Sequence, residues 1–241
     1  MSVTLIEARG CANHLLARLS DKDFEPLCSQ LVLVHTAQKQ VLHERNGPIR
    51  FVYFPCSCAM SNMIFFEDGT AVEVGTVGNE GVSGIELLAR ASVATETSIC
   101  QVEGKSLRME AGEFAKAIDG RTPLRRVSEC YLQGYLSQVS QSVACNRKHS
   151  LEARFARWLL VTHDRVLGNE FCLTQEFLGD MLGVQRPSVS LVAAEFQKEG
   201  LIQYARGHIK ILDRERLEAT SCECYAAVRA QFKRVLGLSY G

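Results

Sequence analysis

The sequence predicts an α+β protein with an N-terminal antiparallel β jelly-roll barrel, a long helix and a C-terminal winged helix-turn-helix domain. Three observations support this fold class. Short runs rich in β-branched and aromatic residues recur between residues 30 and 110, separated by polar or Gly-containing turns. One uninterrupted helical pattern begins at Pro123. Two short amphipathic helices and two short strands then follow from Leu173 to Ile211.

Composition is compatible with two small globular domains. The chain has 241 residues, of which 46% are hydrophobic and 22% charged. No apolar run is long enough to cross a membrane, and the N-terminal stretch MSVTLIEARG lacks the basic start and apolar core of a signal peptide. We therefore expect a cytoplasmic protein that does not associate with membranes.

Charge gives little support for nucleic-acid binding by itself. The formal net charge is +0. Between Cys145 and Arg216, eleven Lys and Arg face nine Asp and Glu, which leaves a surplus of two. A nucleic-acid binder of this composition needs a locally basic face and the doubled contacts of a dimer.

The N-terminal region begins with helical spacing and continues with strands. Leu15, Leu16, Leu19, Phe24 and Leu27 follow a helical period, and Asp21 is expected to cap the second of two short helices. Turns are predicted at Glu67-Asp68-Gly69 and at Gly104-Lys105. The strands are expected at residues 31–35, 39–43, 49–54, 58–66, 70–77, 97–104 and 105–110.

A short helix over Ala111–Ile118 and the long helix from Pro123 should follow the barrel. The long helix carries apolar residues every three or four positions: Leu124, Val127, Tyr131, Leu132, Tyr135, Leu136, Val139 and Val143. Its glutamines, Gln133, Gln138 and Gln141, are expected to face solvent. We predict a parallel homodimer, with Leu124, Val127, Tyr131, Tyr135 and Val139 as the dimer helix positions; a role within one chain is the alternative.

The C-terminal region contains the strongest motif. Leu151–Val166 should form an amphipathic helix that buries Phe155, Trp158, Leu159 and Leu160. Thr174 should cap the next helix, and Gly183 should allow the sharp turn into a second helix that starts near Gln185. Val189, Val192, Ala193 and Phe196 form the buried stripe of that helix, and Gly200 ends it. A helix capped by Asp213 and containing Leu217, Ala219 and Cys222 should follow the wing, and residues 226–238 also look helical.

The outward side chains of this motif can reach base edges and phosphates in a major groove. An ordinary helical hairpin is the alternative, but the following hairpin with its Arg206, His208 and Lys210 favours DNA binding. The predicted DNA-binding residues are Thr174, Gln175, Gln185, Arg186, Ser188, Ser190, Arg206 and His208.

Ten cysteines are present. Without a secretion signal, free thiols are favoured over a disulfide framework. Cys56-x-Cys58 and Cys222-x-Cys224 are the close pairs, and neither has the spacing of a zinc ribbon or a redox motif. We therefore assign no metal site and expect most cysteines to be small buried hydrophobes, with a redox or metal role as the lesser alternative.

Put together, the chain resembles the Crp/Fnr family of bacterial transcription regulators over nearly its whole length. The residues that carry the resemblance are residues 52–55 (VYFP), 68–81 (DGTAVEVGTVGNEG), 144–160 and 173–190. The resemblance implies a cyclic-nucleotide-binding-like sensory barrel (residues 1–120), a long dimerisation helix and hinge (121–147, with the hinge near Cys145–Ser150) and a winged helix-turn-helix domain (148–241). It also implies double-stranded DNA, a second copy of the chain and RNA polymerase as partners.

The family pattern also indicates an effector pocket around Gly84, Glu86, Leu87, Glu96 and Thr97. Members that bind cyclic AMP hold its phosphate with an Arg where this chain has Glu96. A carboxylate there repels a phosphate, so cyclic AMP is not expected, and Arg90 is the nearest replacement. Cys11 and Cys28 do not form the cysteine cluster of the iron–sulfur members, and His14, His35 and His43 are isolated candidates for haem ligation. The cofactor therefore stays unknown.

The recognition helix departs from the family as well. Arg186 stands where the family commonly places an Arg that contacts guanine. Pro187 and Leu191 replace residues that read bases in several members, so we expect a different operator.

Three classes of function are compatible with the sequence to different degrees. The leading interpretation is a homodimeric, sequence-specific DNA-binding regulator. The alternative is a redox or ligand sensor whose output is a protein–protein contact. An enzyme on a cupin-like barrel is disfavoured because residues 50–110 contain no His, so no catalytic residues are assigned.

Overall fold

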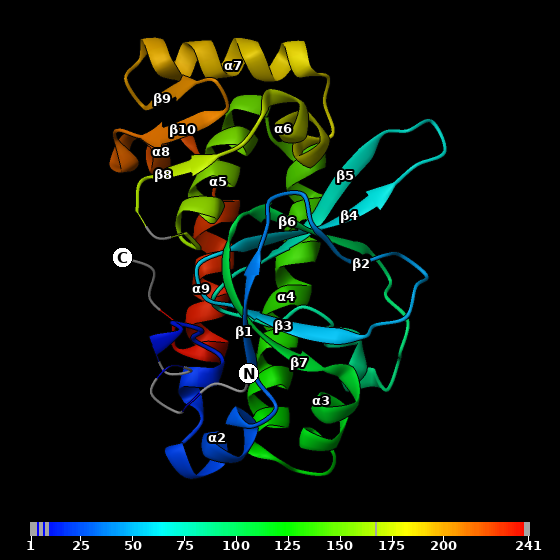
Figure 1. The fold of residues 1–241 in the computed structure, drawn as a ribbon. Helices are drawn as coiled ribbons and strands as arrows, with labels where there is room; N and C mark the ends of the chain where they lie inside the picture. Colours follow the sequence, from blue (N-terminus) through cyan, green and yellow to red (C-terminus); the bar gives the residue numbers. More distant parts are fainter. Residues whose placement is uncertain (1–3, 5–6, 8–9, 167, 239–241) are drawn as a thin grey trace.

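The computed structural model describes residues 4, 7, 10–166 and 168–238, and it confirms the predicted fold class (Figure 1). A β-rich N-terminal half, one long helix and a C-terminal helix-turn-helix region follow one another along the chain. Most of the N-terminal stretch that bears on a signal peptide lies outside the described residues. Among the described residues, no helix is long and apolar enough to cross a membrane.

The N-terminal half contains two antiparallel sheets. The first has the order β1-β7-β3 and the second the order β2-β6-β4-β5. The predicted turn at residues 67–69 joins β4 to β5, while Gly104 is already the first residue of β7 and not part of a turn. The strands are β1 (Val32–Thr36), β2 (Val41–His43), β3 (Phe51–Pro55), β4 (Ala59–Phe65), β5 (Ala71–Val77), β6 (Thr97–Val102) and β7 (Gly104–Glu110).

Short helices close the barrel at its ends: η1 (Leu16–Arg18), α2 (Asp21–Cys28), η2 (Ile85–Ala89) and α3 (Ala111–Ala117). The expected cap at Asp21 is wrong by one residue. Ser20 is the N-cap of α2, and its hydroxyl accepts a hydrogen bond from the Asp23 backbone N–H, because a serine oxygen reaches that donor from the extended cap position. Asp21 instead lies in the first turn, where its charge favours the helix dipole.

The long helix α4 (Pro123–Lys148) starts at the predicted proline, with Thr122 as its cap. The prediction that its glutamines face solvent is wrong for Gln138, which is buried and donates to the Thr76 backbone oxygen at 2.9 Å. The polar side chain is tolerated there because both ends of its amide find partners: its oxygen accepts from Arg165 at 2.9 Å.

The C-terminal half builds the helix-turn-helix around a small sheet. Its elements are α5 (Leu151–His163), β8 (Glu170–Cys172), α6 (Gln175–Leu182), α7 (Arg186–Lys198), β9 (Ile202–Ala205), β10 (His208–Ile211), α8 (Arg214–Thr220) and α9 (Cys224–Leu236). The sheet has the order β8-β10-β9. The sequence does not predict β8, because three residues are too few for a recognisable strand pattern.

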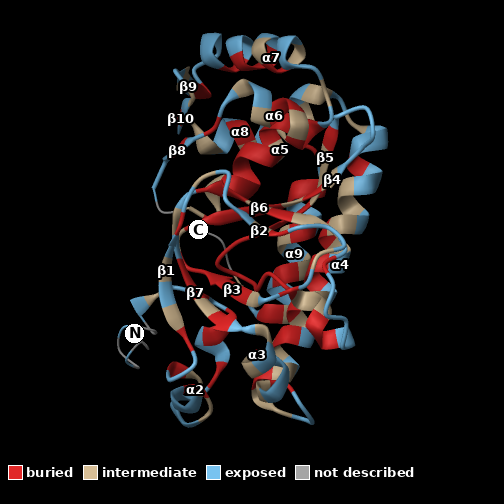
Figure 2. Cartoon of the chain, turned by 45° about the vertical axis from the view of Figure 1, so that its right-hand side comes forward, coloured by how far each residue is buried: buried red, intermediate tan, exposed pale blue. Residues whose placement is uncertain are grey.

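The last helix returns to the first half of the molecule. α9 packs along α4, and its Val228, Phe232 and Leu236 join the core of the barrel (Figures 1 and 2). Gly134 permits this close approach, since a Cβ at that position would lie 2.8 Å from the Phe232 ring. Cys222, which the sequence places inside the preceding helix, lies just beyond it because α8 ends at Thr220.

Buried polar contacts join the two halves. Arg165, which follows α5, forms a buried ion pair with Glu80 at 2.8 Å and also donates to Gln138 of α4. Trp158 of α5 donates from its indole nitrogen to the Glu73 carboxylate of β5 at 3.2 Å. The orientation of the helix-turn-helix on the barrel is therefore held by buried polar contacts as well as by apolar packing.

Two of the cysteines depart from the expectation. Cys11 and Cys56 form a disulfide with a Cα–Cα distance of 5.2 Å, so the prediction of free thiols is wrong for this pair. The physical reason is tertiary: the N-terminal segment lies against the end of β3, and sequence separation hides that proximity. Cys28, Cys58 and Cys100 are buried free thiols, as expected.

Candidate nucleic-acid interface and barrel cavity

Local sequence rules set the geometry of the helix-turn-helix. The Thr174 hydroxyl accepts from the Phe177 backbone N–H at 3.2 Å and begins α6. Gly183 ends that helix with a φ of 63°, a left-handed conformation that glycine adopts without strain. Pro187 lies in the first turn of α7, where no backbone N–H is needed. The predicted buried stripe of α7 is confirmed, because Val189, Val192, Ala193 and Phe196 are all buried.

A groove of about 450 Å³ lies between the starts of α6 and α7 and the turn of the wing. Thr174, Gln175, Arg186 and Arg206 line it, so four of the predicted DNA-binding residues lie together. The turn between β9 and β10 places Arg206 at a φ of 51°, followed by Gly207 at 82°. Two guanidinium groups therefore flank a helix N-terminus, an arrangement that attracts phosphate.

The other predicted DNA-binding residues lie around this groove and do not line it. Gln185 is the exposed N-cap residue of α7, and Ser188 lies in the first turn of that helix. The Ser190 hydroxyl donates to the Gln175 side-chain oxygen at 2.7 Å, which ties the start of α7 to the start of α6. The Nδ1 atom of His208, on β10, lies 3.2 Å from the sulfur of Cys172, on the neighbouring strand β8.

Apart from Gly207, which has no side chain, two groove residues were not among the predicted DNA-binding residues. Tyr204 of β9 donates from its hydroxyl to the Leu173 backbone oxygen at 2.7 Å, and burial raises the pKa of Tyr204 to about 12 against the opposing effect of Arg186. Glu176 is the second, and it is an acidic group that disfavours an anion on its side of the groove. The contact of Tyr204 with the groove depends on the fold. Its position on a strand of the wing is the one sequence feature that could have indicated it.

A cavity of about 180 Å³ lies between the barrel, η2 and α4. Its lining includes His43 and Asn62 from the second sheet and Tyr131, Leu132, Tyr135 and Leu136 from α4. The long helix is therefore one wall of the cavity. The volume is below the usual range for drug-sized ligands, which indicates a small occupant.

The polar groups of this cavity are acidic. Glu86 and Glu96 both line it, and the Thr95 hydroxyl donates to Glu96 at 2.8 Å and lies 3.2 Å from Glu86. Burial, and the nearby Glu86 carboxylate, raise the pKa of Glu96. The two ring nitrogens of His43 are buried and have no hydrogen-bond partner among the described residues, and burial lowers its pKa.

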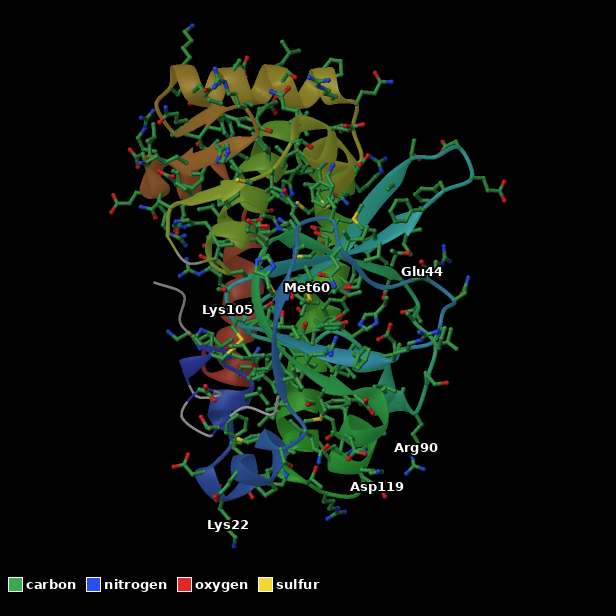
Figure 3. The ribbon with its side chains drawn as sticks, viewed as in Figure 1. Lys22, Glu44, Met60, Arg90, Lys105 and Asp119 are labelled. Atoms are coloured by element: carbon green, nitrogen blue, oxygen red, sulfur yellow. A yellow bond between two sulfur atoms is a disulfide. The ribbon has the colours of Figure 1, made fainter. Side chains whose placement is uncertain are left out.

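The predicted effector pocket is partly reproduced. Gly84, Glu86 and Glu96 line the cavity, whereas Leu87 and Thr97 do not. Leu87 turns into the barrel core, and the Thr97 hydroxyl accepts from the Arg45 backbone N–H at 3.2 Å. Arg90 is no replacement for a phosphate-binding Arg, because its exposed side chain pairs with Asp119 at 3.3 Å on the surface (Figure 3).

Burial within one chain changes the predicted dimer positions on α4. Leu124, Tyr131 and Tyr135 are buried in the chain's own core, so these three cannot contact a second chain. They are buried because α4 packs its strongest apolar face on the barrel and α9. Val127 and Val139 are partly buried, and Leu136 and Val143 are 56% and 68% exposed.

The comparisons with known proteins agree with this geometry. Residues 153–220 match the family model of the Crp-like helix-turn-helix domain. A comparison with curated proteins finds no sequence match.

Solved structures share the whole fold. FixK2 from Bradyrhizobium japonicum matches with a TM-score of 0.67 at 16% identity, over 80% of this chain and 98% of that one. A CRP-family transcriptional regulator from Thermus thermophilus matches at 0.64 and 23% identity, over 86% and 98%. A second regulator of the CRP/FNR family from the same organism matches at 0.63 and 18%, over 79% and 98%.

The fold combines an N-terminal β-rich barrel, a long helix and a C-terminal helix-turn-helix. The predicted resemblance is confirmed at the level of fold and domain: residues 153–220 match a Crp-like helix-turn-helix domain, and the chain has the fold of solved Crp/Fnr-type transcription regulators.

Proposed function

We propose that this protein acts as a homodimer that binds a specific double-stranded DNA operator and that an effector in the barrel regulates the binding. The observation that carries the proposal is the groove in which Arg186 and Arg206 flank the start of α7. A positively charged helix N-terminus beside an exposed wing fits the geometry by which such domains enter a major groove.

Each of the four predicted residues that line the groove has a role in this proposal. Arg186 lies in the first turn of α7, where a guanidinium can bind the O6 and N7 atoms of guanine with two hydrogen bonds. Thr174 and Gln175 at the start of α6, and Arg206 on the wing, would bind phosphates and fix the orientation on the duplex. The exposed Leu191 replaces a polar contact with an apolar one, which suits the methyl group of thymine.

A second copy of the chain would cover the outer face of α4. Leu132, Leu136, Val139 and Val143 follow the four-three-four spacing of a coiled-coil seam; Leu136 and Val143 are exposed, whereas Leu132 and Val139 are half-buried at the edge of the barrel core. Pairing through this seam presents two α7 helices, which must lie about 34 Å apart to enter successive major grooves. The predicted position Val139 stays in this seam.

The effector would act through α4. Leu132 and Leu136 belong both to the cavity wall and to the proposed seam, so a ligand that moves this wall changes the dimer. The two carboxylates favour a small neutral or cationic ligand over an anion. RNA polymerase as a partner and the cytoplasm as the location remain predictions of the same proposal.

Selection of bound sites from random double-stranded DNA tests the DNA-binding function. We expect enrichment of a two-fold symmetric site and a binding constant that falls steeply with salt concentration. No enrichment, together with salt-independent association or none, would contradict the proposal and favour the alternative of a sensor with a protein partner.

The absence of a phosphate-binding Arg leads to a prediction about cyclic AMP. We expect millimolar cyclic AMP to leave the thermal unfolding temperature unchanged, because a ligand that binds only the folded state must raise it. The same measurement with the Glu96→Gln variant separates charge repulsion from steric exclusion. A rise in the unfolding temperature of the wild type would show that the acidic cavity accepts an anion.

A further inference from the structure

Four metal-ligating side chains converge at the junction between the long helix and the C-terminal helices. Cys145 and His149 come from the end of α4, Cys222 comes from the connection between α8 and α9, and Cys224 is the first residue of α9. Their ligand atoms all lie within 4.8 Å of one another. The three cysteines are buried, and the His149 side chain is 16% exposed. We propose that these residues form a mononuclear, tetrahedral Cys₃His zinc site.

The distances fit a single ion. With Zn–S bonds of about 2.3 Å and Zn–N bonds of about 2.0 Å, tetrahedral geometry puts two sulfurs about 3.8 Å apart and a sulfur and a nitrogen about 3.5 Å apart. The Cys145 and Cys222 sulfurs are 3.5 Å apart, and the Cys224 sulfur lies 3.5 Å from the His149 Nδ1 atom. An iron–sulfur cluster is larger than one ion and needs its ligands spread more widely than these four.

The surroundings of the four ligands are those of a metal site. The second ring nitrogen of His149, Nε2, lies 3.1 Å from the Glu223 carboxylate, which orients the ring and leaves Nδ1 directed at the thiols. The Gln141 side-chain nitrogen donates to the Cys224 sulfur at 3.1 Å, a contact that stabilises a thiolate. Donor types, distances and outer contacts therefore all agree with bound Zn²⁺.

A disulfide explains less of this arrangement. A bond between Cys145 and Cys222 would use two of the four ligands and would leave Cys224, His149 and the Glu223 contact without a purpose. The site also lies where the long helix meets the C-terminal helices. Cys145 and Cys222 are 77 positions apart in the chain and meet near the predicted hinge at the end of α4. A bound ion would therefore fix the C-terminal helices to the end of the long helix.

Metal analysis of the purified full-length protein tests the site. The protein is loaded with zinc under reducing conditions and freed of excess metal by gel filtration. Its zinc content is then measured by inductively coupled plasma mass spectrometry. We expect one zinc per chain in the wild type and none in the Cys222→Ala/Cys224→Ala variant. Cys172→Ser is the matched control, because Cys172 also contacts a histidine but lies on the wing, and it should keep one zinc.

Cobalt replacement of zinc gives a second measurement that needs no variant. Wild-type protein titrated with Co²⁺ should develop the intense visible bands of tetrahedral cobalt with thiolate charge transfer, saturating at one equivalent. His149→Ala should keep the thiolate charge transfer and bind cobalt at least tenfold more weakly. Zinc held equally by the wild type and the double variant, octahedral cobalt spectra, or a Cys145–Cys222 disulfide that persists under reducing conditions would overturn the proposal. None of these measurements depends on DNA.

Discussion

Arg186 lies in the first turn of α7 and is exposed; Pro187 follows it in that turn, and Tyr204 lines the same groove. The position of Arg186 suits direct contact with a base because the helix N-terminus enters the groove first. Arg206 reaches the same groove from a different element, so its contact with DNA would be to the backbone.

We predict that Arg186→Ala weakens binding to the selected operator by about 1–3 kcal/mol, or about five- to 150-fold, and relaxes the preference at one base position. Arg186→Lys should recover little of the affinity, because an ammonium group cannot form the paired hydrogen bonds. Electrophoretic mobility shift assays measure the effect. Lys22→Ala, on α2 at the opposite end of the molecule, is the charge-matched control (Figure 3). Equal losses in both variants would remove the base-reading role.

Glu73 is the residue whose ionisation should affect stability. Burial raises the pKa of Glu73 to about 7, although hydrogen bonds from Ser61 and Trp158 and the charge of Arg157 oppose the shift. The folded state therefore holds this proton more tightly than the unfolded state. The stabilisation is complete below the unfolded pKa near 4.5 and is lost as the pH rises to about 7.

We expect thermal unfolding between pH 5 and 8 to show this loss in the wild type. The Glu73→Gln variant, which resembles the protonated carboxyl group, should gain stability relative to the wild type as the pH rises. Glu67→Gln in the β4–β5 turn is the control, and its unfolding curve should run parallel to that of the wild type. Parallel curves for Glu73→Gln would disprove the assignment.

At the scale of elements, α4 shows what the spacing of apolar residues can and cannot predict. The eight apolar positions correctly predicted a long helix with buried contacts. They could not tell which of two apolar faces meets the barrel, because both faces follow the same 3.6-residue period. The structure assigns Leu124, Tyr131 and Tyr135 to the chain's own core, and Leu136 and Val143 stay exposed.

Dimerisation should accordingly depend on the exposed face. Leu136→Glu/Val143→Glu should convert a dimer into a monomer, since two buried like charges per chain would face their counterparts across the seam. Multi-angle light scattering at micromolar concentration gives the mass. Leu212→Glu changes an equally apolar and exposed residue outside α4, and it should remain a dimer. A double variant that stays dimeric would move the interface elsewhere.

At the scale of the whole molecule, one buried ion pair connects three parts of the chain. Arg165 lies beyond α5, Glu80 follows β5, and Gln138 belongs to α4. Neither charge is more than 3% exposed, so each depends on the other for solvation. The orientation of the helix-turn-helix therefore depends on a contact formed between residues far apart in sequence.

Breaking this pair should be costly. We expect Arg165→Met to lower the free energy of unfolding by about 3–5 kcal/mol, because Glu80 is left as an unpaired buried charge. The Glu80→Met/Arg165→Met variant should regain a large part of this loss. Urea unfolding followed by circular dichroism measures both. If the double variant is as unstable as the single one, packing of the arginine stem and not the ion pair holds the halves together.

By itself, the sequence determined most features that rest on neighbouring residues. It predicted the strand runs, the start of α4 at Pro123, the cap at Thr174, the turn at Gly183 and the buried stripe of α7, because dihedral preferences, capping and periodicity act over a few positions. Only the tertiary structure decided which face of α4 is free, that Tyr204 completes the groove, that Cys11 meets Cys56, and that Cys145, His149, Cys222 and Cys224 converge. Those outcomes depend on contacts between distant segments, and no local pattern encodes the distance between two residues that the fold alone brings together.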